Sequence, residues 1–348
     1  MFISQKRNQW PAVNLLAALF LAITFSVISG CQSEKKQIYS YTGLTMGTTF
    51  SVKWVASNDK DKPRISALIN DELLKVNQSM STYMPDSELS LFNQLPAGSQ
   101  KNVSERLAFL LSLALSISDE SEGAFDVTVG PLVNLWGFGP DGRVVKSPSE
   151  GQLQTVMEQV GYASVHLKGQ RLHKEKNSYI DLSAIAKGYG VDVIADLLEA
   201  EGISSYLVEI GGELRAKGLK PDGMNWRIAI ESPLASLDRQ IHKIISVKDV
   251  GIATSGDYRN YFEENGVRFS HTIDPHTARP ISHKLASVTV LAKTCAEADA
   301  YATAIMVMGP NQAIEFSEKQ GIQSYLLVKT DQGFKELMTP GFANYLVQ

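Results

Sequence analysis

The sequence predicts an α+β fold in which helices are mixed with a largely antiparallel sheet. Most strand-like segments follow one another between residues 206 and 291, as expected when antiparallel strands are joined by turns. Helical segments, with apolar residues three and four positions apart, lie on both sides of this run. The chain shows no internal repeat and no regular β-α-β alternation, which argues against a parallel sheet. We therefore expect one domain, with a two-lobed form of it left open.

The composition is that of a globular protein with a buried core, because 44% of the 348 residues are hydrophobic and 20% are charged. The formal net charge of −4 provides no basic surface, so no nucleic acid partner is expected. Only two cysteines occur, Cys31 and Cys295, and no disulfide framework is expected. We expect Cys295 to be a small buried side chain, not a reactive thiol.

The first 30 residues are expected to be a targeting signal. Lys6 and Arg7 precede an apolar stretch, residues 15–28, that is too short for a comfortable membrane span. It ends in Ile28-Ser29-Gly30-Cys31, which resembles a bacterial lipobox, in which the cysteine is lipidated and becomes the new N-terminus. The alternative is an ordinary signal peptide with an incidental cysteine. The chain thus divides into a lipoprotein signal peptide (1–30), a lipidated tether (31–40) and a folded domain (41–348).

Helices dominate the N-terminal half of the predicted domain. Residues 41–56 are rich in Thr, Val and aromatic residues and predict a strand, in which Gly47 marks a bulge or a close approach. Segment 124–136 is expected to be a loop or short strand, and residues 165–180 a β-hairpin. Apolar periodicity and capping residues predict helices over residues 63–80, 87–93, 104–120 and 147–160.

The segment DLSAIAKGYGVD, residues 181–192, joins a strand-like run at 178–180 to a helix. Asp181 or Ser183 is expected to cap this helix, whose free N–H groups favour an anion. Lys187 adds a positive charge one turn later. Gly188 and Gly190 lie inside the helix, where each costs roughly 1 kcal/mol relative to alanine. Either they are small packing positions, or another backbone or a ligand approaches closely.

Strands dominate after residue 200. A hairpin is predicted at Asn265-Gly266, which is a strong turn signal. Two helices, residues 297–308 and 310–320, are separated at Gly309-Pro310. The expected strands are residues 206–210, 226–230, 241–247, 250–253, 285–291, 325–328 and 334–337.

Two more groups of side chains are candidates for chemistry. His271, in the segment SHTIDP (270–275), suits a general base near neutral pH, although a single histidine is more often a structural hydrogen-bonding residue. Asp299 and Thr303 are four residues apart and share one face of a predicted helix. A carboxylate with a hydroxyl suits Mg²⁺, which retains waters and binds phosphate oxygens. The alternative is an acid that complements the helix dipole.

The motifs of several enzyme classes are absent from the sequence. It contains no Walker loop, no His-Glu-x-x-His or Cys-x-x-Cys motif, no Gly-x-Ser-x-Gly elbow and no Gly-x-Gly-x-x-Gly fingerprint. Serine hydrolases, zinc enzymes and dinucleotide-dependent dehydrogenases are therefore disfavoured. The residues alone indicate an exported α+β protein with a possible Mg²⁺ and phosphate site.

Nine segments together resemble the ApbE family of FAD:protein FMN transferases, which are periplasmic lipoproteins. They occur in the family's order over essentially the whole predicted mature chain. Thr272 and Ala278 depart from the family, which commonly has an apolar residue and a glycine at these positions. The segments are TMGTT (45–49), MSTY (80–83), SELSLFN (87–93), GAFDVT (123–128), DLSAIAKGYGVD (181–192), GGE (211–213), TSGDYRNY (254–261), SHTIDP (270–275) and EADA (297–300).

The resemblance implies a single ApbE-like domain and a Mg²⁺-dependent phosphoryl transfer with FAD as substrate. A Thr or Ser hydroxyl of a partner protein would attack the pyrophosphate, FMN would become attached through a phosphoester, and AMP would leave. The implied acceptors are subunits of the Na⁺-translocating NADH:quinone reductase or of the Rnf complex. The protein would be lipid-anchored in the bacterial cell envelope, facing the periplasm, with the inner membrane favoured over the outer.

The resemblance also implies roles for individual residues. His271 would be the general base that takes the proton of the acceptor hydroxyl. The metal would be held by the Ala184 carbonyl, Asp299 and Thr303. The glycines of the 181–192 segment would admit the flavin dinucleotide. The flavin nucleotide pocket would be lined by Met46, Tyr83, Ala124, Phe125, Asp126, Asp181, Lys187 and Ile273.

Two other functions stay open at this point. The same site could admit water as the nucleophile and hydrolyse FAD to FMN and AMP. Tyr83 favours retention of FAD over its hydrolysis, by family resemblance. The protein could also be a periplasmic flavin-binding lipoprotein without turnover, although a histidine next to a metal site argues against this.

Overall fold

The computed structural model describes residues 35–140, 142, 146–233, 240–257, 261–264 and 266–347. The predicted signal peptide and Cys31 lie outside these ranges, as do Tyr258, Arg259 and Asn260 of the predicted 254–261 motif and Asn265 of the predicted turn. Within the described ranges, no helix has both the length and the apolar composition needed to cross a membrane.

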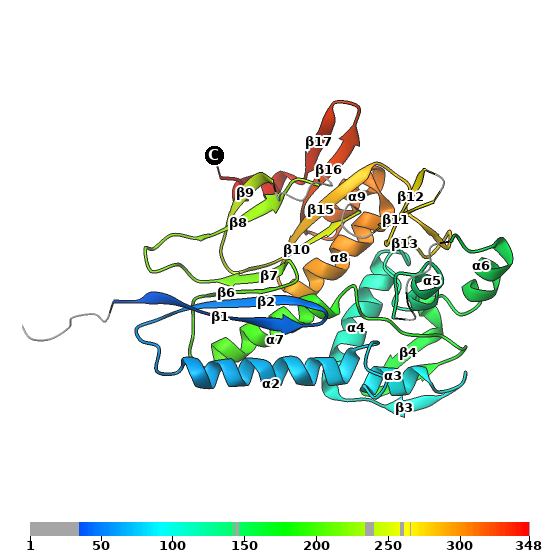
Figure 1. Cartoon of the computed structure of the whole chain (residues 1–348), viewed down its shortest axis with the longest axis horizontal. Coiled ribbons are helices and arrows are strands. Elements are labelled where there is room, and N and C mark those ends of the chain that lie inside the picture. The colour runs from blue at the N-terminus through cyan, green and yellow to red at the C-terminus, as the bar shows by residue number, and fades with distance from the viewer. Residues whose placement is uncertain are drawn as a thin grey trace, which may run out of the picture.

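An eight-stranded sheet runs through the molecule (Figure 1). Every neighbouring pair of strands in it is antiparallel, which confirms the predicted fold class. In spatial order the strands are β1 (Gln37–Thr45), β2 (Thr48–Ala56), β6 (Tyr206–Ile210), β7 (Glu213–Lys217), β10 (Val250–Gly256), β15 (Leu285–Ala292), β16 (Gln323–Thr330) and β17 (Gly333–Met338).

The strand predicted over residues 41–56 is a hairpin, so this prediction was wrong. β1 and β2 pair from Gln37↔Ala56 to Thr45↔Thr48, and only Met46 and Gly47 form the turn. Both turn residues have positive φ angles, 49° and 69°. Such a two-residue turn normally carries Asn or Gly at both positions. Methionine is uncommon in such a turn, and for this reason no chain reversal was predicted here.

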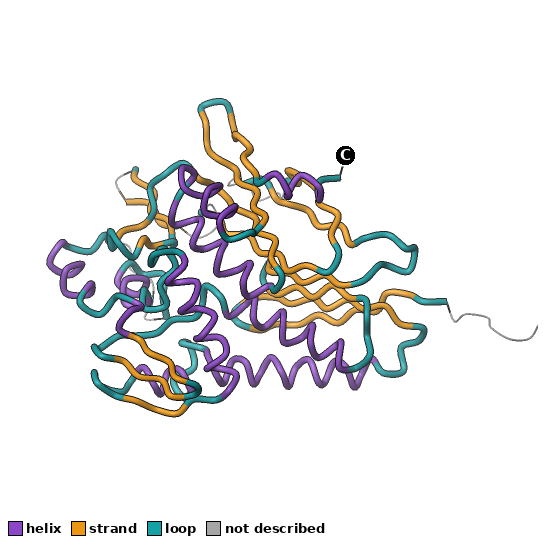
Figure 2. The backbone as a smooth tube through the Cα atoms, turned by 180° about the vertical axis from the view of Figure 1, so that it is seen from behind, coloured by secondary structure: helices purple, strands orange, loops and turns teal. Residues whose placement is uncertain are grey.

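Helices cover one face of the sheet (Figure 2). Helix α8 (Cys295–Met308) packs on β10 and β15, and α7 (Ala186–Ala200) packs on β6, β7 and α8. Helix α2 (Lys62–Met80) lies on α7, and α9 (Pro310–Lys319) lies on β16. Helix α8 can approach the sheet closely because the buried residues that it shares with the core of β10 and β15 include Ala298 and Ala302. Ala296, Ala300 and Ala304 are also buried, in a separate core that includes Tyr189 of α7.

The opposite face of the sheet is covered by the hairpin of β8 (Trp226–Glu231) and β9 (Ile241–Val247). Successive residues along a strand point to opposite faces. Accordingly, Ala253 belongs to the core beneath α8, whereas its neighbour Ile252 packs with Trp226 under the hairpin. The sheet therefore has a hydrophobic layer on each side.

The remaining elements gather around one end of the sheet. They are α3 (Glu88–Asn93), β3 (Gln100–Asn102), α4 (Glu105–Glu120), α5 (Gly130–Leu135), α6 (Glu150–Met157), η1 (Tyr162–Ser164), β4 (Val165–Lys168), β5 (Arg171–Lys174), β11 (Tyr261–Glu264), β12 (Val267–Ser270), β13 (Ile273–Asp274) and β14 (Arg279–Pro280). Near the end of the chain, η2 (Pro340–Tyr345) lies elsewhere, against β9 and β16. The capped start of α3 is confirmed, because the Ser87 hydroxyl accepts a hydrogen bond from the Ser90 N–H. β11 and β12 confirm the predicted hairpin.

Two further segments differ from the prediction. Residues 130–135 form α5, because Pro131 is well suited to the first turn of a helix. The 178–180 run is not a strand, and α7 begins only at Ala186, with neither Asp181 nor Ser183 as its cap. The Asp181 carboxylate instead accepts bonds from the N–H and hydroxyl of Ser183, at 2.8 and 2.6 Å. This local turn competes with helix capping and delays the helix.

Candidate active site

A cavity of about 1130 Å³ opens where the start of α7, the side of α8 and the ends of several strands meet. It exceeds the range of about 300–1000 Å³ that is usual for drug-sized ligands, and it suits a larger molecule such as a dinucleotide. Every site residue predicted within the described ranges lines it. These are Met46, Tyr83, Ala124, Phe125, Asp126, Asp181, Ala184, Lys187, His271, Ile273, Asp299 and Thr303.

The most charged part of the cavity lining joins α7, β7 and α8. The Lys187 ammonium lies 3.2 Å from Glu213 Oε1 and 3.9 Å from Asp299 Oδ2. Asp299 Oδ2 also accepts a hydrogen bond of 3.0 Å from the Gly188 N–H. Glu213 and Asp299 are buried, at 6% and 4% exposure. One cation therefore faces two carboxylates at a site with little water.

The pKa values follow from this crowding. Burial, reinforced by the charge of Asp299, raises the pKa of Glu213 to about 7, even though Lys187 opposes the shift. Burial likewise raises the pKa of Asp299 against the opposing effects of Lys187 and the Gly188 N–H. For Lys187, burial is outweighed by Asp299 and Glu213, and its pKa is raised. The lysine is thus charged at neutral pH. Its single positive charge does not offset the burial of the two carboxyl groups, whose pKa values stay raised.

The residues fit a hard divalent cation. Asp299 and Thr303 both line the cavity from α8, one helical turn apart, and Ala184 lines it just before α7. Glu213 Oε2 is buried and has no hydrogen-bond partner, as expected next to a site that a cation or a ligand donor completes. Within the described residues, no three His, Cys, Asp or Glu side chains cluster as metal ligands. Carboxylate, hydroxyl and carbonyl oxygens with retained waters suit Mg²⁺.

Met46, Tyr83 and Asp181 also line the cavity. Met46 is held in the β1–β2 turn, which Asn77 of α2 supports by a hydrogen bond of 3.1 Å to Thr45. The Tyr83 ring is 66% exposed. Partial burial of the ring and the charge of Asp181 raise the pKa of Tyr83, which remains a neutral phenol. Tyr83 thus offers a flat aromatic surface near the Asp181 carboxylate.

The loop of Ala124, Phe125 and Asp126 forms a buried wall. Asp126 accepts hydrogen bonds from the Thr128 N–H and hydroxyl, at 2.7 and 2.6 Å, and from the Tyr162 N–H at 3.0 Å. These bonds hold the loop in shape. The Asp126 carboxylate therefore stabilises the loop, and the wall that this loop forms faces the cavity.

His271 comes from a different part of the chain, directly after β12. Its ring lies edge-on to Phe138, with 6.3 Å between ring centroids, and it lines the cavity. The backbone around it is anchored, because the Ile281 N–H donates to the Thr272 carbonyl at 3.0 Å and Ile273 is buried. The fold thus brings His271 to the cavity that Asp299 and Thr303 line from α8.

The two glycines of α7 make room for protein, which corrects the expectation that they admit a flavin. A Cβ on Gly188 would lie 2.4 Å from the Cys295 carbonyl oxygen of α8. A Cβ on Gly190 would lie 2.9 Å from the Met46 methyl carbon. Cys295 is buried, as predicted, and is a free cysteine. The α7–α8 contact is therefore a backbone-to-backbone approach.

Two acidic residues that matter for the site were given no role by sequence reasoning. Glu213 stood in a quoted motif, but its partner Lys187 lies on a different element. Asp192 ended another motif, and its partners lie on β7 and α8. For Asp192, the only signal in the sequence was an acid between apolar positions of a predicted helix, which could equally face solvent.

The chain has extensive similarity to known proteins. The profile of the ApbE family matches residues 46–326. A Vibrio cholerae protein named FAD:protein FMN transferase is 46% identical over 323 residues, which cover 92% of this chain and 96% of that protein. A Haemophilus influenzae protein of the same name is 45% identical over 322 residues, with coverages of 88% and 91%.

Solved structures agree with these relatives. The flavin transferase ApbE from Vibrio cholerae matches with a TM-score of 0.83 at 44% identity, over 89% of this chain and all of that one (100%). The ApbE protein from Thermotoga maritima matches with a TM-score of 0.79 at 28% identity, over 90% and 100% of the two chains. This chain belongs to the ApbE family.

Proposed function

We propose that this transferase moves the FMN part of FAD to a Thr or Ser hydroxyl of a partner protein, forming a phosphoester and releasing AMP. The proposal is supported by the names of the relatives. It is carried by one structural observation, namely that a histidine, a lysine and the oxygen donors suited to Mg²⁺ line a single cavity of dinucleotide size.

In this proposal the nucleotide is held by the cavity walls. Met46, Tyr83 and the wall of Ala124, Phe125 and Asp126 would bind the flavin nucleotide, together with Ile273. Asp181, which also lines the cavity, would bind polar groups of the nucleotide. Positioning of this kind accounts for much of the rate enhancement in phosphoryl transfer.

His271 would accept the proton of the acceptor hydroxyl as its oxygen attacks the phosphorus of the FMN moiety. The bond from this oxygen to phosphorus forms, while the bond from phosphorus to the bridging oxygen breaks. AMP leaves with the bridging oxygen. Lys187 would offset negative charge that develops on the phosphate oxygens. The protein's own groups thus handle the proton and part of the charge.

Ala184, Asp299 and Thr303 would hold Mg²⁺. When bound, this cation would neutralise the pyrophosphate and make its phosphorus a better electrophile. Asp299 would then pair with the metal, and Lys187 would have one carboxylate partner instead of two. Glu213 would keep the ammonium in place at 3.2 Å.

We also propose where the enzyme works. The lipobox-like sequence ending at Cys31 supports a lipid anchor in the bacterial cell envelope, with the folded domain facing the periplasm and the inner membrane favoured. Subunits of the Na⁺-translocating NADH:quinone reductase or of the Rnf complex are the proposed acceptors, by analogy with the family.

The test mixes the purified protein with FAD, Mg²⁺ and an acceptor subunit, and follows flavin fluorescence of the separated proteins in a gel. We expect fluorescence on the acceptor, with AMP as the second product. Free FMN with an unlabelled acceptor would mean that the protein is a hydrolase. Bound FAD without any FMN would mean that it only binds flavin. Asp299→Ala is expected to lose both activity and its dependence on Mg²⁺.

A further inference from the structure

The two halves of the proposed metal site lie on different elements that must keep a constant separation. Ala184 precedes α7, whereas Asp299 and Thr303 lie on α8. Near the cavity, one hydrogen bond joins the helices directly, from the Gly188 N–H to Asp299 Oδ2 at 3.0 Å. If Asp299 turns toward a metal, this bond competes with coordination, so other contacts must hold the helices together.

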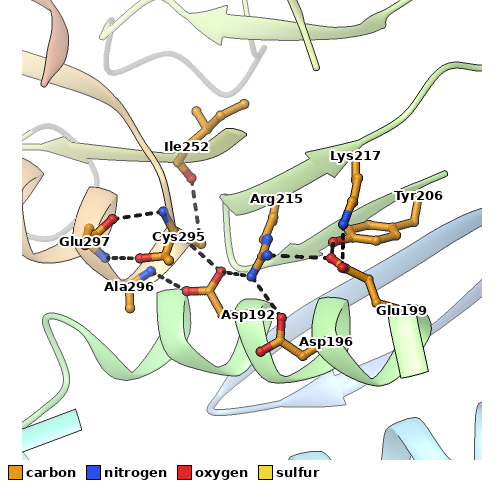
Figure 3. Close-up of polar contacts among 11 residues, drawn as sticks. Asp192, Asp196, Glu199, Tyr206, Arg215, Lys217, Ile252, Cys295, Ala296 and Glu297 are labelled. Atoms are coloured by element: carbon orange, nitrogen blue, oxygen red, sulfur yellow. Dashed lines mark hydrogen bonds and ion pairs between the residues drawn. The ribbon is translucent and has the colours of Figure 1, made fainter. Parts of the chain in front are cut away.

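Asp192 of α7 provides such a contact (Figure 3). Its Oδ1 accepts a hydrogen bond from the Cys295 N–H at 3.0 Å, and its Oδ2 accepts one from the Ala296 N–H at 2.8 Å. These are the first two N–H groups of α8. The next one, on Glu297, is bonded to Thr294 at 3.2 Å, within a capping box. A residue from another helix therefore completes the N-terminus of the helix that carries Asp299.

Strand β7 stabilises the contact between Asp192 and α8 from the side. Arg215 donates to Asp192 Oδ1 at 3.0 Å, two residues along the strand from Glu213, which binds Lys187. The charges alternate, because α7 contributes Lys187 and then Asp192, whereas β7 contributes Glu213 and then Arg215. A slip of α7 along β7 would place like charges together, and alternation therefore favours one register. Each pair also touches α8, at Asp299 or at its first turn.

We propose that Asp192 is a positioning residue that holds α8 against α7 and thereby sets the spacing of the metal-binding oxygens. This inference rests on the proposed function, because it concerns the proposed Mg²⁺ site. Asp192 does not touch the reacting atoms. Its effect should therefore appear in the affinity for Mg²⁺ and not in the affinity for FAD without metal.

The chain offers a matched control for this test. Asp196, one turn further along α7, also pairs with Arg215, at 3.2 Å. Its side chain is 70% exposed, against 10% for Asp192, and its ion pair with Arg215 is on the outer side of the helix. Asp192→Asn and Asp196→Asn each remove one negative charge, at positions one turn apart. Only Asp192→Asn also removes a carboxylate oxygen that accepts a hydrogen bond from an N–H group of α8.

The experiment measures binding of Mg²⁺ alone to the full-length protein and both variants by isothermal titration calorimetry. It also measures FAD binding in EDTA by flavin fluorescence. We expect Asp192→Asn to weaken Mg²⁺ binding by about 10–100-fold, as is common when groups that orient metal ligands are lost. FAD binding in EDTA and both properties of Asp196→Asn should stay at wild-type levels. In transfer assays, excess Mg²⁺ should restore the rate of Asp192→Asn.

Several results would overturn the inference. Wild-type Mg²⁺ affinity in Asp192→Asn would do so, as would equal weakening by Asp196→Asn. If Asp192→Asn does not fold, Arg215→Gln decides, because it keeps both N–H acceptors and removes only the lateral charge. It should weaken Mg²⁺ binding by a smaller factor, and an unchanged affinity would reject the proposal. A wild-type protein that binds no Mg²⁺ would refute the proposed metal site itself, and that outcome is distinct from the others.

Discussion

At the scale of single residues, the site combines a surplus of negative charge with little water. Lys187 is shared between Glu213 and Asp299, and Glu213 keeps one oxygen without a partner. Burying such a group costs free energy unless something binds to it. The described residues therefore hold a site whose electrostatics favour arrival of a cation or a hydrogen-bond donor.

The raised pKa of Glu213, about 7, leads to a pH-dependent stability. In the folded protein Glu213 holds its proton more tightly than in the unfolded chain, where the pKa is near the ordinary 4.5. Its contribution to stability is therefore fully present below about pH 4.5 and is lost as the pH rises to about 7. The loss is at most about 1.4 kcal/mol per pH unit.

Glu213→Gln should abolish this dependence, because an amide does not titrate. We expect the free energy of unfolding of the wild type to fall relative to that of Glu213→Gln between about pH 5 and pH 7. Above about pH 7, the difference between the two proteins should stay constant. Urea denaturation at a series of pH values measures this. The exposed Glu318→Gln is the control and should track the wild type. Parallel curves for Glu213→Gln over the whole range would contradict the burial argument.

His271→Ala should separate binding from chemistry. The variant should bind FAD as the wild type does but transfer FMN about 10²–10⁴-fold more slowly, because only the proton acceptor is lost. Single-turnover transfer to an acceptor, together with flavin fluorescence titration, measures both quantities. His276→Ala is the control, since His276 is not among the described residues that line the cavity. Full transfer by His271→Ala would exclude the proposed base.

The sequence anticipated residues whose role follows from local spacing. Asp299 and Thr303 share a helix face whatever the rest of the fold does. Glu213 and Asp192 act through partners on other elements, and no local pattern announces such a pair. Asp181 was expected as a cap of α7 but forms a local turn with Ser183. For short polar side chains, the hydrogen bond of a local turn and that of a helix cap differ little in free energy.

At the scale of elements, the site depends on how closely α7 and α8 approach. Gly188 lies against the Cys295 carbonyl, and a Cβ would meet backbone atoms that cannot move aside alone. Elements with long apolar periodicity, such as α2 and α4, were predictable. The β1–β2 reversal was not, because Met46 adopts a left-handed conformation that methionine rarely takes. Ala278 is similar, with a φ of 58°, a conformation that glycine adopts more readily.

Gly188→Ala tests the close approach. The added methyl should push α8 away from α7 and reduce the free energy of unfolding by about 1–3 kcal/mol, as overpacking usually does. It should also weaken Mg²⁺ binding. Gly151→Ala is the control, because Gly151 lies in α6 with no atom within 4 Å of the added Cβ. That control should gain about 0.5–1 kcal/mol. A neutral Gly188→Ala would show that α8 can shift freely.

At the scale of the whole molecule, an antiparallel sheet covered on both faces supports a cavity at the junction of its elements. The fold class was predictable from the run of strands, because short connections leave few topologies open. The order of the eight strands was not, since it depends on pairings between distant segments such as β2 with β6. The proposed membrane attachment rests on the N-terminal sequence alone.

Cys31→Ser tests that attachment. The substitution removes the only proposed site of lipidation, so the protein should move from the membrane fraction to the soluble fraction of the cell envelope. Transfer by the purified variant to a soluble acceptor domain should equal that of the wild type, because Cys31 precedes the folded domain. Membrane association that survives the substitution would contradict a lipid anchor.

If the chain is anchored at Cys31 as proposed, the position of β1 limits how far the enzyme can act. The tether from Cys31 to Lys36 can span at most about 20 Å. The nine residues of β1 add about 30 Å before the chain reaches Met46, which lines the cavity. With lipid on Cys31, Met46 can stand no more than about 50 Å from the bilayer surface. The enzyme would then serve only a shallow layer above the membrane, and only hydroxyl groups displayed within that layer could be modified.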